Sequence, residues 1–454
     1  MSENSSRHEG APDDRAQVLS LPIRFGGSAD GILQRAYRSY RGEEGAIRAL
    51  ESEKLGLLRH YDVQGMDTAV AMCFWGRSGS FLLASYLDSH DDIVMLPMIA
   101  SEAIYPFFQE YEPLSVWEKL IAYPEYSEAK KGDGAMFFKG DFAIAAADYY
   151  AAVLALFETY GDRPAAWLDV RSRFFQFLHA AYSVAIGRRP GNPRPLMIYA
   201  QHWTDEDLAG RFLEDFPKGR FIHTIRDPIS AFDSWYDRKE EMRTLYNRPT
   251  DPGASYFPLA VDTFNDLLTW DRSHRGMEQR TCAIRFEDMH VAHEVTMRRL
   301  ADWLGIPYRP SMLESTWNGV PYVVEIRGVA SCGPNPANAR RRSKNLDVAD
   351  RLMVFALLQH NFIAWNYPSP RAMRRRWIRL CSIALTWLLP TKIELAAARW
   401  VMRVQALPSL RSGRLRFAFG APLFLLRQRL RMMLLIATEA RARLTGSRNL
   451  LKPL

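Results

Sequence analysis

The chain has 454 residues, of which 48% are hydrophobic, so it is long enough to bury a full core and still carry an appendage. Its net charge of +8 is unevenly distributed. Residues 371–454 hold 16 Arg and 2 Lys against only Glu394 and Glu439, a net charge of +16 that leaves −8 for the other 370 residues. We call residues 371–454 the basic C-terminal segment. The basic balance therefore does not predict a nucleic-acid-binding surface over the whole protein.

The cysteine pattern argues against a disulfide framework and against a metal site. The four cysteines lie far apart, with no CxxC spacing: Cys73, Cys282, Cys332 and Cys381. Such a pattern is typical of the reducing cytosol. The polar, acidic N-terminus predicts a disordered leader over residues 1–20 rather than a signal peptide. No apolar run approaches the ~18–20 residues that cross a bilayer, so we expect a cytoplasmic protein.

The first elements predict the opening unit of an α/β fold. Residues 21–67 read as an N-terminal helical segment, with an amphipathic helix over 42–60. Residues 68–75 are a short apolar run ending at Gly76, which predicts a buried strand. Residues 81–89 continue with helical periodicity. The order is thus strand, glycine-rich loop, helix.

The rest of the body repeats this alternation. Residues 104–190 are rich in Ala, Tyr and Phe and predict several helices. Further strands and helices are predicted over 197–200, 206–216, 220–225, 282–286, 287–304 and 348–365. This order predicts an α/β fold with a P-loop-like central parallel sheet flanked by helices over residues 68–370. The basic C-terminal segment is then an added helical region.

The loop Gly76-Arg77-Ser78-Gly79-Ser80 is a candidate anion-binding site. Glycines let the backbone approach an anion, and the N-terminus of the following helix supplies N–H donors and a positive dipole. Arg77 adds a forked set of donors, and the two serines add hydroxyls. It is not a nucleotide-kinase loop, because the Walker lysine is missing at the required spacing. The alternative is a tight turn with a surface arginine.

A second candidate anion site follows the strand at 220–225. Arg226, Asp227 and Pro228 stand at its end, a helix is predicted to begin near Ile229, and Ser234 lies two turns into that helix. Proline suits the first turn of a helix, since no donor is lost there. An arginine and a hydroxyl at the carboxyl end of a parallel sheet are suited to an anion. The alternative is an Arg–Asp pair that only caps the helix.

Together these segments resemble the sulfotransferases that use 3'-phosphoadenosine 5'-phosphosulfate (PAPS). In that family a strand-loop-helix of the type (R/K)SG(T/S)(T/S) holds the 5'-phosphosulfate, and an RxPxxxxxS segment holds the 3'-phosphate. The matching residues here are Arg77 to Phe81 and Arg226 to Ser234. Residues 82–97 and 285–307 add to the likeness. The resemblance is to the bacterial branch related to carbohydrate and tyrosylprotein sulfotransferases, and it covers roughly residues 68–366.

The resemblance implies sulfuryl transfer from PAPS, with PAP (3'-phosphoadenosine 5'-phosphate) as product and no metal. It makes Gly76, Arg77, Ser78, Gly79 and Ser80 a donor-binding loop, with Arg77 and Ser80 on the reacting oxygens. Phe81 replaces the family's second hydroxyl, so one hydrogen bond is expected to be lost, although its backbone N–H still donates. Arg226 and Ser234 are the expected 3'-phosphate ligands.

The catalytic base has two candidates. Glu102 matches the glutamate that follows the first helix in carbohydrate and tyrosylprotein relatives. His202 follows a predicted strand, and neutral imidazole accepts a proton. The alternatives are a helix-surface or N-cap acid for Glu102 and a loop residue bonded to backbone for His202. Glu287 and Asp288 are predicted to orient or cap structure.

Two basic stretches complete the predictions. Arg341, Arg342 and Lys344 match the region where family members close the nucleotide site with a basic loop; the alternative is a solvated charge run. In the basic C-terminal segment, Arg and Trp flank short apolar runs, which suits helices lying on an anionic membrane surface. The alternative is a helical subdomain that packs on the body or on a second subunit.

The sequence therefore predicts a PAPS-dependent sulfotransferase located in the cytoplasm or on the inner face of the cell membrane. The expected acceptor carries a hydroxyl or amine and is a glycan or a lipid-linked saccharide; no specific nucleic acid is expected. The competing hypotheses are a nucleotide-dependent kinase and a membrane-associated scaffold on an inactivated sulfotransferase fold. Oligomerisation is left open.

Overall fold

The computed structural model describes the larger part of the chain. The described residues are 28–49, 54–74, 78–131, 136–201, 206–234, 277–326, 329–339, 346–389, 402–414 and 453–454, with single positions between 395 and 438.

A five-stranded parallel sheet forms the centre of the molecule, in the order β2-β3-β1-β4-β5. Its strands are β1 (Ala69–Phe74), β2 (Ile93–Met95), β3 (Leu196–Gln201), β4 (Arg220–Ile225) and β5 (Thr281–Arg285). Four of them lie where the sequence predicts, so the predicted parallel α/β sheet is confirmed. The short strand β2 was not predicted, because three residues carry too little periodicity.

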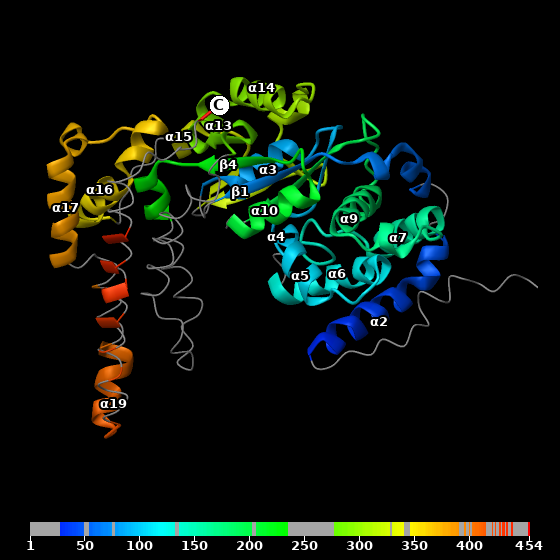
Figure 1. The fold of residues 1–454 in the computed structure, drawn as a ribbon, viewed down its shortest axis with the longest axis horizontal. Helices are drawn as coiled ribbons and strands as arrows, with labels where there is room; N and C mark the ends of the chain where they lie inside the picture. Colours follow the sequence, from blue (N-terminus) through cyan, green and yellow to red (C-terminus); the bar gives the residue numbers. More distant parts are fainter. Residues whose placement is uncertain are drawn as a thin grey trace, which may run out of the picture.

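Helices cover both faces of the sheet (Figure 1). Side chains alternate along each strand, so Ala71 and Tyr199 face one layer while Met72 and Ile198 face the other. The larger core contains side chains from α2 (Ser28–Ala49), α5 (Ile104–Glu110), α6 (Val116–Lys131), α7 (Ala146–Tyr160), α9 (Arg171–Ala185) and α10 (Glu206–Asp215). The smaller core contains side chains from α3 (Ser80–Leu87), α13 (Phe286–Val291) and α14 (His293–Leu304).

The remaining elements are short or lie outside the two layers. They are α4 (Met98–Ser101), α8 (Ala165–Leu168), β6 (Thr316–Trp317), β7 (Val320–Pro321), β8 (Val323–Ile326), β9 (Val329–Cys332), α15 (Pro336–Ala339), α16 (Val348–Ala364), α17 (Arg376–Leu388) and α19 (Leu407–Arg411). In the described part of the chain, no helix combines the length and the hydropathy of a membrane span.

Two predicted helices differ from the observed ones. The N-terminal helix is α2, which starts fourteen residues before the predicted helix and buries Ile32, Ala36 and Tyr40; only a 3-10 helix follows, at Leu55–His60. The single helix predicted over 287–304 is two helices, since Ala292 has non-helical backbone angles of φ −127° and ψ 42°. Helix α14 ends at Gly305, which caps it at φ 71°.

The C-terminal residues return to the sheet. Pro453 forms a parallel bridge with Ala283 on the edge strand β5, and the N–H of Leu454 donates to the carbonyl of Ala283 at 3.0 Å. The end of the chain accordingly lies beside α13 and α14 (Figure 1). This contact covers part of an edge that would otherwise present unpaired backbone groups.

Candidate active site at the carboxyl ends of β1 and β4

The loop after β1 enters its helix through Gly79. Gly79 has φ 92° and ψ 20° and immediately precedes α3, which begins at Ser80. A Cβ at this position would lie 2.4 Å from Cδ2 of Phe286. Only glycine meets both conditions, because other residues are strained at this φ and would displace the Phe286 ring. Gly76 and Arg77 lie outside the described residues.

A buried hydroxyl pair joins this loop to the neighbouring strand. Ser78 Oγ lies 2.6 Å from Oγ1 of Thr224, and both side chains are fully buried. Thr224 is the penultimate residue of β4, two residues before Arg226. The pair therefore holds the two predicted anion-binding segments side by side, at the carboxyl ends of β1 and β4. Strands β2 and β3 lie on one side of this point and β5 lies on the other, and such a point is the usual ligand site of parallel sheets. Thr224 carried no sequence signal beyond its place in a strand.

Phe81 has a packing role. It is the second residue of α3, and its ring stacks on Trp317 with centroids 6.3 Å apart. Ser80 begins the helix and is 5% exposed. The first turn of a helix leaves its N–H groups without intrahelical acceptors, so the backbone here presents donors whatever side chain stands at position 81.

The second predicted segment begins directly after β4. Arg226 is 8% exposed, and its guanidinium lies 4.3 Å from the centroid of the Phe286 ring. Residues 228–234 are helical. Asp227 caps this helix, since its Oδ1 accepts from the N–H of Ser230 at 2.7 Å. Burial raises the pKa of Asp227. The capping role thus belongs to Asp227, while Arg226 packs on an aromatic face; Ser234 is half-buried in the same helix.

Glu287 fixes the backbone beside Arg226. Its Oε1 accepts from the N–H of Asp227 at 3.1 Å, and its Oε2 accepts from the hydroxyl of Tyr367. Burial raises the pKa of Glu287, whereas these two hydrogen bonds favour its ionised form. Arg285 lies 4.6 Å from the ring of Tyr367. This orienting role is the one predicted for Glu287, but Tyr367 was missed because it stands 80 residues further on.

His290 also packs against Phe286. The two rings are perpendicular, with centroids 4.4 Å apart, and Nδ1 of His290 accepts from the N–H of Asn335 at 2.9 Å. Burial, followed by the charge of Arg226, lowers the pKa of His290 to about 4. The imidazole is therefore neutral near pH 7, and its proton is on Nε2. That nitrogen is buried without a hydrogen-bond partner among the described residues.

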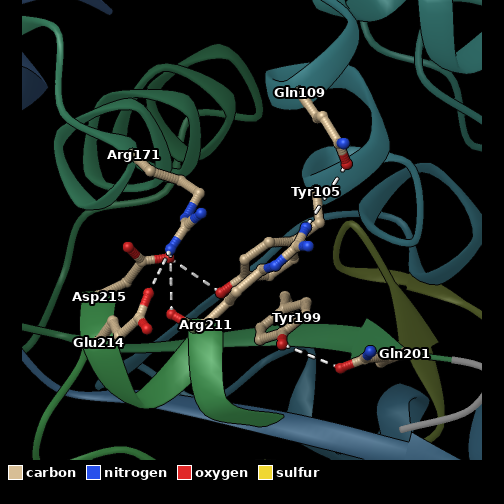
Figure 2. Close-up of polar contacts among 8 residues, drawn as sticks. All are labelled: Tyr105, Gln109, Arg171, Tyr199, Gln201, Arg211, Glu214 and Asp215. Carbon is tan, nitrogen blue, oxygen red and sulfur yellow. Dashed lines mark hydrogen bonds and ion pairs between the residues drawn. The ribbon is translucent and has the colours of Figure 1, made fainter. Parts of the chain in front are cut away.

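A polar network reaches the end of β3 from the adjacent helices (Figure 2). Asp215 accepts from Arg171 Nε at 2.6 Å and from the Tyr105 hydroxyl at 3.0 Å. The Tyr105 ring packs beside Tyr199, with centroids 6.0 Å apart, and Tyr199 donates to Gln201 Oε1 at 3.0 Å. Gln201 is the last residue of β3 and pairs in register with Cys73 of β1. This network fixes the Gln201 amide at the carboxyl end of β3, beside the end of β1.

Of the two candidate bases, only Glu102 lies among the described residues. Glu102 stands between α4 and α5, next to Ser101, whose Oγ accepts from the N–H of Ala200 at 2.8 Å. Ala200 is the penultimate residue of β3, so Glu102 lies near the same edge of the sheet as the donor loop. Burial raises the pKa of Tyr123, and the negative charge of Glu102 acts in the same direction. His202 directly follows Gln201 but lies outside the described residues.

The predicted basic loop lies outside the described residues as well, with Arg341, Arg342 and Lys344. Helix α16 begins directly after it. Asp347 and Asp350 form a reciprocal cap at its start, with the N–H of Asp350 donating to Asp347 at 2.8 Å. Helix α16 therefore has a well-defined N-terminus.

The parallel sheet and the loop between β1 and α3 define an α/β protein with a P-loop-like architecture. The model of the Sulfotransferase family matches residues 70–310, more than half of the chain, and the chain belongs to this family. No curated protein matched in a sequence comparison.

Several solved structures are distantly similar. The sulfotransferase domain from the curacin biosynthetic pathway is 16% identical, with a TM-score of 0.37, covering 67% of this chain and 99% of that one. The sulfotransferase domain of the Synechococcus PCC 7002 olefin synthase is 15% identical, with a TM-score of 0.41 and coverages of 67% and 96%. Sulfotransferase STF9 from Mycobacterium avium is 13% identical, with a TM-score of 0.32 and coverages of 68% and 87%.

Proposed function

We propose that this chain transfers the sulfuryl group of PAPS to a hydroxyl or amine of a glycan or lipid-linked saccharide. The observation that supports the proposal is the Ser78–Thr224 pair, which joins the two predicted anion-binding segments across β1 and β4 in a member of the Sulfotransferase family. The acceptor class rests on the likeness to carbohydrate sulfotransferases and on the basic C-terminal segment.

The two groups of proposed ligands suit a nucleotide that has an anionic group at each end. Gly79 turns the backbone into α3, so that the first-turn N–H groups, together with Arg77, are the proposed ligands of the 5'-phosphosulfate. Arg226 and Ser234 are the proposed ligands of the 3'-phosphate. When bound, PAPS supplies the sulfuryl group and leaves as PAP.

The chain's own residues provide electrostatic stabilisation and a proton acceptor. As the acceptor oxygen bonds to sulfur and the sulfur–phosphate oxygen bond breaks, negative charge grows on the 5'-phosphate, where Arg77 and Ser80 are proposed to stabilise it. The acceptor proton passes to Glu102 or His202.

A labelled-transfer assay tests this proposal. The full chain is incubated with ³⁵S-labelled PAPS and with separate glycan and lipid fractions of a cell extract. We expect label in one fraction, and we expect Arg77→Ala and Arg226→Ala to abolish its transfer. The variants Glu102→Gln and His202→Gln identify the catalytic base. The variant that removes the base should lower kcat by about 10²–10⁴-fold and leave the affinity for PAP unchanged.

Transfer and binding together separate the enzyme from the scaffold. If the chain binds PAP but transfers label to no fraction, the inactivated scaffold is favoured, and Phe81 in place of a hydroxyl is then the first position to restore. If the folded chain binds neither PAP nor ATP, both the sulfotransferase and the kinase are excluded.

A further inference from the structure

Helix α17 packs one side on the body and exposes apolar residues on the other. Its inner side packs on α16, with Ser382 buried and Arg379 Nη1 3.0 Å from Nε2 of His360. Its outer side exposes large apolar residues, among them Trp377 at 62% and Leu388 at 79%. A helix that only packed on the body would be polar on this outer side.

The exposed apolar residues form one continuous face. At about 100° per residue, they fall within an arc of about 140° on the helix surface. They are Trp377, Leu380, Cys381, Ala384, Leu385 and Leu388. This contiguity distinguishes the face from the scattered apolar residues found on ordinary protein surfaces.

Positive charge gathers at the N-terminal end of this face. Arg371, Arg374, Arg375 and Arg376 precede or begin α17, and all four are exposed. The whole basic C-terminal segment carries +16 and only two acids. A partner for this surface must therefore be apolar where it meets the leucines and anionic at the rim.

Exposed leucines and arginines also occur together further along the basic C-terminal segment. Exposed leucines recur at spacings of three and four residues, which is one stripe on a helix: Leu423, Leu426, Leu430 and Leu434. Arg427 and Arg431 are exposed beside them. Helix α19 projects away from the sheet (Figure 1), whereas Pro453 is bridged to β5.

We propose that the outer face of α17 and the leucine stripe bind the surface of an anionic phospholipid bilayer. Trp and Leu would enter the boundary between headgroups and acyl chains, while the arginines meet the phosphates. Charge argues against a second copy as the occupant, because two such segments would bring +16 against +16. This inference goes beyond sulfuryl transfer and does not depend on it.

Vesicle flotation with the full chain tests the proposal. The vesicles are phosphatidylcholine alone or with 30% phosphatidylglycerol. We expect binding to the anionic vesicles, weakened when NaCl is raised from 0.1 to 0.5 M. The double variant Trp377→Ser/Leu388→Ser should lower the partition coefficient at least about tenfold, and so should Arg374→Glu/Arg375→Glu.

The matched control is Val291→Ser/Val295→Ser, which removes two apolar side chains, 59% and 53% exposed, from α13 and α14. It should bind like the wild type. Equal binding of all variants, or no binding to anionic vesicles, overturns the proposal. So does a dimer in sedimentation equilibrium that the Trp377/Leu388 variant disrupts, because the face then serves a second copy. Substitutions are used rather than truncation, since the last residues pair with β5.

Discussion

At the scale of single residues, the candidate site depends on side chains that pack around Phe286. Gly79, Arg226 and His290 all lie against this ring. Phe286 therefore supports both the predicted donor loop and Arg226, the predicted 3'-phosphate ligand. Because the three residues share this contact, the stability effects of substitutions at them should not be additive.

Gly79→Ala should destabilise the protein by about 2–4 kcal/mol, because alanine is strained at φ 92° and its Cβ would collide with Phe286. The matched control is Gly305→Ala, where φ is 71° and nothing lies within 4 Å. There only the backbone strain of about 1–2 kcal/mol is expected. Urea denaturation measures both, and equal losses would contradict the close contact with Phe286.

His290 should make stability depend on pH. Its pKa falls from 6.5 to about 4 on folding, so between these values the unfolded chain binds more protons. The stability that the neutral His290 contributes is fully present above pH 6.5. As the pH falls towards 4, the free energy of unfolding decreases by about 3 kcal/mol at most. The unfolding free energy of His290→Gln should therefore fall less steeply than that of the wild type between pH 7 and 5. Parallel curves would refute the assignment.

At the scale of elements, the sequence located the strands better than the helices. Strands β1, β3, β4 and β5 are buried apolar runs bounded by turn residues, and this signal is local. The break at Ala292 and the early start of α2 depend on tertiary packing, which periodicity does not report.

The same division holds for the candidate site. Ser78, Gly79, Ser80 and Arg226 could be picked out because they follow the ends of strands, and Ser234 because it stands eight residues after Arg226, as in the family's RxPxxxxxS segment. Thr224, Glu287 and Tyr367 act through contacts between distant segments, such as the hydrogen bond from Tyr367 to Glu287. The direction of the Gln201 amide depends on Tyr199, whose own neighbours come from α5 and α10.

At the scale of the whole molecule, the two ends of the basic C-terminal segment are both attached to the body. Helix α17 packs on α16, and Tyr367, just before the segment, bonds to Glu287 at the candidate site. At the other end of the segment, Pro453 is bridged to Ala283 of β5. This arrangement suits an enzyme that meets its acceptor at a bilayer.

The central claim is that the loops after β1 and β4 bind opposite ends of one nucleotide. The most direct test is calorimetric titration with PAP and with 5'-AMP, which differ only in the 3'-phosphate. The wild type should prefer PAP by at least about tenfold, and Arg226→Ala should lose most of this preference. Arg77→Ala should weaken both nucleotides alike, and the exposed control Arg298→Ala should change neither. Equal affinity of the wild type for PAP and 5'-AMP, or a preference that survives in Arg226→Ala, would contradict the account.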